Sequence, residues 1–159
     1  DNGANKPSDY IFVLEGRYSI ENWVLDPLFL SAVLLRNQIL TPEDLGLGDT
    51  MTYVRLGELT DAQKQTMIDR LTIILGKPTT SKVATKYVGG FELMVPEWWS
   101  KTQGHELEGH ILTSMPKTLG LKKSNKFLFP AVLVPTIQDY PGFLPNAILD
   151  IFERILQKI

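Results

Sequence analysis

The sequence contains no cysteine, which excludes disulfide bonds and cysteine-ligated zinc or iron–sulfur sites. A chain without cysteine is also typical of a reducing compartment, so we expect a cytoplasmic protein. Long apolar runs are missing too. The runs at residues 11–14, 28–35 and 127–134 are all shorter than the roughly 20 residues that a membrane-spanning helix needs. We therefore expect no membrane association.

Neither sign of charge is in clear excess. Sixteen basic residues against eighteen acidic ones give a formal net charge of -2. This balance does not indicate nucleic-acid binding by the surface as a whole, although it is compatible with a local basic patch. The phosphate-binding pattern G-x-x-x-x-G-K-[ST] is also absent, so this chain is not itself an ATPase of that type.

What the sequence does contain is a set of clear helix signals. Asp26 followed by Pro27 is typical of a helix start, with Asp26 as the N-cap, and the apolar residues 28–35 predict a buried helix. Thr60 and Gln63 have the spacing of a capping box, and the apolar stripe that follows them predicts a second helix. These signals favour an α+β fold that is predominantly helical with a few short strands.

Strand signals are fewer and shorter. The continuous apolar run at residues 10–14 predicts a strand covered on both faces, and residues 87–95 predict a second strand with a bulge or a close backbone approach at its glycine pair. Residues 51–56 favour a short strand or a loop. Two prolines interrupt the apolar residues 127–137, so we expect a broken, packed segment there, followed by a last helix that starts near residue 146.

Acidic residues surround the first predicted strand. Glu15, Glu21 and Asp26 follow it, and Asp1 precedes it. Carboxylates gathered at the ends of a strand are the ligands that Mg²⁺ prefers, because this hard cation binds oxygen. The alternative is structural: Asp26 caps a helix while Glu15 and Glu21 face solvent.

The order DNGANKPSD, then a strand, then RYSIENWVLDP at residues 17–27, resembles the Toprim nucleases that are fused to or partnered with ABC-type ATPases. These are the overcoming-lysogenisation-defect family and its relatives in phage defence. The resemblance covers about residues 1–30 and implies the end of a truncated Toprim-like α/β core, with residues 31–159 as a helical extension packed on it. It implies that Asp1 and Glu21 are ligands of Mg²⁺ or Mn²⁺, and that the intact protein hydrolyses DNA phosphodiesters together with an ATPase domain or subunit.

Parts of the family pattern are missing from this chain. The first Toprim strand with its glutamate and the first aspartate of the D-x-D motif have no counterpart, so we expect this chain alone to be inactive. The first residue is Asp1 rather than methionine, and residues 1–9 read as a loop. We therefore expect a processed protein or an excised part of a longer one.

The stretch GHELEGH at residues 104–110 offers a second candidate site. It is close to the zinc-peptidase pattern H-E-x-x-H, but His105 and His110 are five residues apart, about 140° around a helix. In the Toprim nucleases that this chain resembles, a segment laid out like VPEWWSKTQGHELEGHIL supplies a lysine to the active site. The resemblance implies that His105 stands in place of that lysine, with Lys101 able to compensate from nearby. The structural alternative is the exposed start of a helix with solvated histidines.

A different class of function also remains open. A non-catalytic helical module would bind a protein partner, either through the apolar residues 127–137 or through the last helix. A zinc metallopeptidase is the third alternative, and it predicts zinc bound at His105 and His110.

Overall fold

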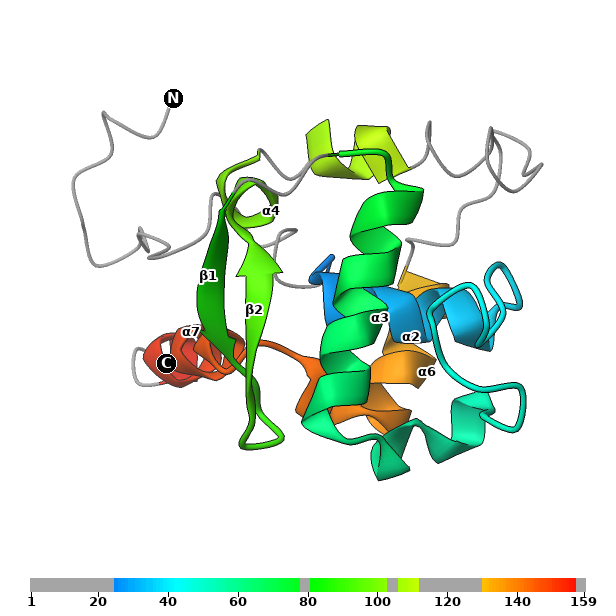
Figure 1. Cartoon of the computed structure of the whole chain (residues 1–159). Coiled ribbons are helices and arrows are strands. Elements are labelled where there is room, and N and C mark those ends of the chain that lie inside the picture. Colours follow the sequence, from blue (N-terminus) through cyan, green and yellow to red (C-terminus); the bar gives the residue numbers. More distant parts are fainter. Residues whose placement is uncertain (1–24, 78–80, 103–105, 112–129, 157–159) are drawn as a thin grey trace.

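The computed structural model describes residues 25–77, 81–102, 106–111 and 130–156 (Figure 1). Mixed helical and strand structure confirms the α+β class. The Toprim-like part of that expectation, the strand predicted at residues 10–14 and the division at residue 30 remain predictions, because residues 1–24 lie outside the described part. In chain order the elements are α2 (Pro27–Arg36), the 3-10 helix η1 (Tyr53–Glu58), α3 (Asp61–Ile74), β1 (Lys82–Lys86), β2 (Glu92–Pro96), α4 (Glu97–Lys101), α6 (Pro130–Asp139), the 3-10 helix η2 (Pro141–Phe143) and α7 (Ala147–Leu156). Residues 106–111 are also helical.

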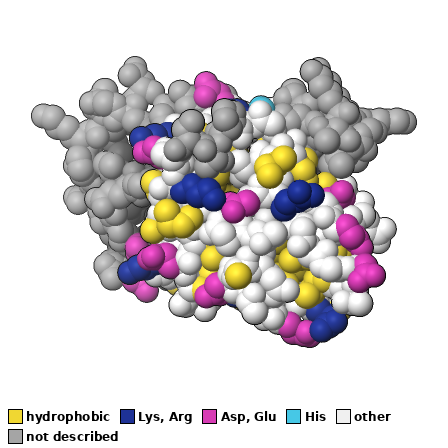
Figure 2. Space-filling model, in the orientation of Figure 1, with side chains coloured by type: hydrophobic (Ala, Val, Ile, Leu, Met, Phe, Trp, Pro, Cys, Tyr) yellow, Lys and Arg dark blue, Asp and Glu magenta, His cyan; other side chains and the backbone are white. Residues whose placement is uncertain are grey.

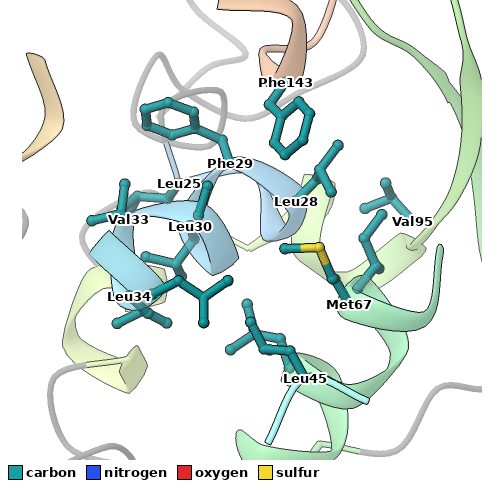
Figure 3. Packing of buried hydrophobic residues seen from close by; sticks show 14 of the residues in the cluster. Leu25, Leu28, Phe29, Leu30, Val33, Leu34, Leu45, Met67, Val95 and Phe143 are labelled. Carbon is teal, nitrogen blue, oxygen red and sulfur yellow. The ribbon is translucent and has the colours of Figure 1, made fainter. Parts of the chain in front are cut away.

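Helix α2 is buried on every side and forms the centre of the core. It begins as predicted: Asp26 is the N-cap, its Oδ1 accepts a hydrogen bond from the Leu28 amide at 3.0 Å, and Pro27 occupies the first helical position. Every residue from Pro27 to Leu35 is buried. Figure 3 shows Phe29 on one side of the helix and Leu28 on the side of Met67 and Val95. Each such side chain contributes roughly 1.5–3 kcal/mol when it is fully buried.

Helix α3 packs against α2 and also confirms its prediction. The capping box is complete, because Thr60 Oγ1 accepts from the Gln63 amide at 3.3 Å and Gln63 Oε1 accepts from the Thr60 amide at 2.9 Å. Met67 and Leu71 are fully buried on the face toward α2. Gly76 follows the helix with a φ of 68°, a left-handed conformation that glycine adopts without strain.

The strand expected at residues 87–95 is the turn and most of the second strand of a hairpin, which corrects the prediction. β1 and β2 pair antiparallel with Ala84 opposite Met94, and the residues between them form the turn, where Gly90 has a φ of 82°. The predicted close backbone approach is present at Gly89, whose amide donates to the Gly142 carbonyl at 3.0 Å. A Cβ at Gly89 would lie 2.5 Å from a ring carbon of Phe91 and 3.1 Å from that carbonyl, so only glycine fits.

Three further segments complete the comparison with the sequence. Residues 51–56 are neither strand nor simple loop, since η1 begins at Tyr53. The expected break within residues 127–137 is wrong for the described part, where α6 continues through Pro135. Pro130, at the first position of α6, removes no backbone hydrogen bond of the helix, because the first amides of a helix have no partner within it. Pro135 removes one such hydrogen bond. The burial of Leu133 and the contact of α6 with α2 offset this loss. The last helix begins at Ala147, as predicted.

The tryptophan pair belongs to the core. Trp99 is fully buried and Trp98 is half-buried, with their ring centroids 4.8 Å apart. Of the helices in the described ranges, none combines the length and the apolar character that crossing a membrane requires.

Candidate functional site

A groove of about 520 Å³ lies between β1, α4 and the first turn of α7. In Figure 1 β1 forms the left side of the hairpin, with α4 beside its upper end and α7 beside its lower end. Four charged side chains line the groove, two of each sign: Lys86, Lys101, Glu97 and Asp150. Of the residues predicted for the nuclease site, Asp1, Glu21, Lys101 and His105, only Lys101 lies in the described part of the chain, and it lines this groove.

Lys101 is held by an ion pair within α4. Its Nζ contacts Glu97 Oε1 one helical turn earlier, and Ser81 Oγ donates to the other Glu97 oxygen at 2.6 Å. The hydrogen bond from Lys101, followed by that from Ser81, lowers the pKa of Glu97 below its usual value, so the carboxylate is ionised at neutral pH. The Lys101 side chain remains 70% exposed. Exposed pairs of this kind stabilise proteins little, so Lys101 is able to exchange Glu97 for another anion.

The chain that leads into α2 is hydrogen-bonded to two core residues that are the sequence neighbours of groove-lining residues. Trp99, on α4, donates its indole N–H to the carbonyl of Leu25 at 2.8 Å. Tyr87, directly after β1, donates its hydroxyl to Asp26 Oδ1 at 3.0 Å. Leu25 and Asp26 are buried, so both bonds are shielded from water. The end of the segment 17–27 is therefore fixed against the two elements that flank the groove.

Only one of the two histidines, His110, lies in the described part of the chain. His105 lies outside the described residues. His110 is half-buried, and its Nε2 is 3.1 Å from the Leu75 carbonyl. A carbonyl only accepts, so this nitrogen carries the hydrogen. Burial, and then the positive charge of Lys77, lower the pKa of His110, which keeps the ring neutral at pH 7.

The predicted metal ligands Asp1 and Glu21 also lie outside the described residues. Within residues 25–77, 81–102, 106–111 and 130–156, no three His, Cys, Asp or Glu side chains are grouped so that they could hold a metal ion. The roles of Asp1 and Glu21 remain predictions.

Surface charge is mixed on the face that Figure 2 shows. Basic and acidic side chains alternate over the coloured atoms of this face, without a large patch of one sign. This distribution agrees with the nearly balanced composition of the chain. In the groove, likewise, Lys86 and Lys101 are accompanied by the carboxylates Glu97 and Asp150.

Sequence reasoning named Lys101 as a candidate, and that role remains a prediction; it did not foresee the long-range bonds made by Trp99 and Tyr87. The bonds from Trp99 to Leu25 and from Tyr87 to Asp26 join residues 74 and 61 positions apart. Their only sequence signal is that Trp and Tyr each carry a single polar group that needs a partner when the ring is buried.

The chain matches no family model, no curated protein and no solved structure. Its function must therefore be argued from its residues and their geometry.

Proposed function

We propose that this chain is the C-terminal part of a Toprim-like, metal-dependent hydrolase of DNA phosphodiesters that works with an ATPase in DNA processing or phage defence. The resemblance of residues 17–27 and of the preceding loop to these nucleases supports the proposal. The structural observation that supports it best is the hydrogen bond from Trp99 to Leu25, at 2.8 Å. This bond attaches the end of the Glu21 segment to the helix that carries Lys101.

In this proposal the residues have separate roles. Asp1 and Glu21 provide carboxylates for Mg²⁺ or Mn²⁺ in the intact protein, and such an ion neutralises charge on a phosphate. Lys101 leaves Glu97 and contacts a phosphate oxygen of the DNA backbone. His105 contributes to phosphate binding only when it is protonated. The upstream strand and the D-x-D motif complete the site, so this chain alone does not cleave DNA.

The test uses the intact protein and a supercoiled plasmid with Mg²⁺ or Mn²⁺. Glu21→Gln removes a metal ligand and abolishes metal-dependent cleavage. Lys101→Met removes the phosphate contact and lowers the cleavage rate by roughly 100-fold, the scale seen when one preorganised donor is removed. Lys82→Met is the matched control, because Lys82 is also ion-paired, with Asp69 at 2.8 Å, but does not line the groove. Undiminished cleavage by the Glu21→Gln protein would disprove the nuclease role.

The metallopeptidase alternative has weaker support. It needs His110 as a zinc ligand, but the Nε2 of this ring is hydrogen-bonded to the Leu75 carbonyl. A metal would have to displace that bond or bind the other ring nitrogen. Elemental analysis of the purified protein distinguishes the alternatives, since only the peptidase predicts one zinc ion per chain.

The interaction-module alternative has mixed support from α6 and α7. Leu133 and Ile148 are buried in the chain's own core, so they are not available to a partner. Val134 and Leu149 remain exposed on the same two helices.

A further inference from the structure

A second pocket, of about 460 Å³, lies where the end of α2, the loop that follows it and the residues before η1 meet. This loop is cyan in Figure 1. The pocket shares no lining residue with the groove that contains Lys101. Much of its lining is apolar, including Leu35, Leu40 and Met51. Small-molecule sites typically have volumes of about 300–1,000 Å³ and a mainly apolar lining with a few polar groups.

Arg36 gives this pocket its charge. Of the described residues that line it, only Arg36 is charged. The guanidinium lies over the ring of Tyr53, 5.9 Å from the centroid, and its Nε is 3.5 Å from Asp139 Oδ2. No described residue accepts a hydrogen bond from the two terminal nitrogens, Nη1 and Nη2. The planar fork that arginine offers to a carboxylate is therefore unused.

Asp139 is a weak partner for Arg36. The Oδ2 atom that contacts Arg36 already accepts a hydrogen bond from the Tyr53 hydroxyl at 2.8 Å, and 3.5 Å is too long for a good N–H···O bond. The side chains of Arg36 and Asp139 are 37% and 46% exposed, and exposed pairs of this kind stabilise proteins little. Another carboxylate can therefore bind the fork without the loss of a strong interaction.

Gln38, which also lines the pocket, has a backbone conformation that favours glycine. Its φ is 55°, and it alone among the described non-glycine residues has a positive φ. It follows Asn37, the C-cap of α2, at a position where helices commonly have glycine. A residue with a Cβ adopts this conformation at a cost, and such local strain is typical of functional sites. Here the strained residue adds an amide N–H donor to the lining, two positions after Arg36.

We propose that this pocket binds a small organic acid that has one carboxylate and a compact apolar body. This binding is independent of the nuclease proposal. Arg36 donates from its two terminal nitrogens to the carboxylate, and Gln38 donates a further hydrogen bond. The apolar body packs against Leu40 and Met51 and is removed from water.

The surrounding charges favour a monoanion over a phosphate. Two carboxylates contact the lining: Asp139 accepts from Tyr53, and Asp44 accepts from the Thr41 amide at 2.8 Å. Neither carboxylate lines the pocket itself. A ligand with a single negative charge is matched by Arg36, whereas a phosphate dianion has a second charge that these carboxylates repel.

An NMR titration of the full chain with phenylacetate tests the proposal. Phenylacetamide is the matched neutral probe, because it has the same ring and nearly the same size. Phenylacetate shifts the backbone amide signals of Gln38 and Thr52 until they saturate, and it binds roughly tenfold more tightly than phenylacetamide, since charge-assisted hydrogen bonds are the stronger ones. The amide signal of Ala84, in the other groove, stays in place.

Two arginine variants test the recognition of the carboxylate. Arg36→Met removes the guanidinium and keeps an unbranched apolar side chain, so the affinity for phenylacetate falls by roughly tenfold or more. Arg55→Met is the matched control. Arg55 is also an exposed arginine paired with a carboxylate, Glu58 at 2.7 Å, but it does not line the pocket, so its removal leaves the affinity unchanged.

Two further variants give effects that a loss of folding does not produce. Asp139→Asn still accepts the Tyr53 hydroxyl but no longer competes for Arg36, so phenylacetate binds roughly two- to fivefold more tightly. Gln38→Gly relieves the left-handed conformation, so it raises the melting temperature while it weakens phenylacetate binding by roughly two- to fivefold.

Three results would overturn the proposal. If millimolar phenylacetate causes no saturable shift, the pocket binds no acid of this kind. If phenylacetamide binds as tightly as phenylacetate, the carboxylate is not recognised. If Arg36→Met binds as the original chain does, or if Arg55→Met weakens binding equally, Arg36 is not the anchor. Should Arg36→Met fail to fold, unchanged or weaker binding by Asp139→Asn overturns the proposal in its place.

Discussion

The buried bond between Tyr87 and Asp26 allows a quantitative test of the anchor beside the groove. Tyr87→Phe removes only the hydroxyl that donates to Asp26 Oδ1 at 3.0 Å, and it leaves a ring that can still stack on Phe91 at a centroid distance of 5.1 Å. Asp26 is completely buried, so water does not replace the lost donor. Its carboxyl group retains the Leu28 amide as a donor.

The expected cost follows from this burial. Hydrogen bonds to a carboxylate contribute about 1.5–3 kcal/mol, so the free energy of unfolding falls by about 2 kcal/mol. For a chain of this length that loss lowers the melting temperature by about 4–8 °C. Urea unfolding followed by circular dichroism measures it, and the slope with denaturant should be unchanged, because the same surface is exposed on unfolding.

Tyr53→Phe is the matched control. Tyr53 also donates to a carboxylate, Asp139 Oδ2 at 2.8 Å, but the Asp139 side chain is 46% exposed and water replaces the lost donor. This substitution therefore costs less than about 1 kcal/mol. Equal losses in the two variants, or a loss below about 0.5 kcal/mol for Tyr87→Phe, would refute the claim that burial at Asp26 sets the cost.

Three other predictions concern turns, caps and pH. Gly89→Ala introduces a clash at the hairpin turn and destabilises by about 1–3 kcal/mol in urea unfolding, whereas Gly48→Ala, with open space at its Cβ, stays within about 1 kcal/mol. Thr60→Ala breaks the capping box and costs about 1 kcal/mol, measured the same way; no loss would mean that α3 does not need this cap. Burial and then the charge of Lys77 lower the pKa of His110 in the folded protein. The protein therefore has its full stability above pH 6.5, the ordinary pKa of histidine, and loses stability as the pH falls through the lower pKa of the folded state. Lys77→Met raises the pKa of His110 in an NMR titration, and an unchanged pKa would exclude Lys77 as a cause.

The helices that sequence predicted correctly are those whose signals are local. The N-cap at Asp26 and the capping box at Thr60 each act within one helical turn. Both helix starts could therefore be predicted without knowledge of the tertiary structure. The first strand of the hairpin was missed for the opposite reason. β1 has the sequence KVATK, in which only Val83 is a large apolar residue, and it is only half-buried. Such a strand depends on its partner β2 and on the turn rather than on its own pattern.

The break predicted in α6 failed because a local rule was outweighed by packing. Pro135 removes one backbone hydrogen bond, at a cost of about 3 kcal/mol, yet the helix continues because Leu133 is buried and α6 contacts α2. The candidate site shows the same limit. Lys101 could be named from the sequence, but its position relative to Leu25 depends on Trp99, which is 74 residues away from Leu25.

The amide of Gln65 has a consequence for self-assembly. A sheet that grows into a fibril needs two exposed edges, so that each added molecule offers a fresh surface to the next. In the described hairpin one of these edges ends at a glutamine side chain, which cannot pass the ladder onward. A further strand therefore cannot pair with the middle of β2 unless Gln65 gives up its bonds to both the amide and the carbonyl of Met94.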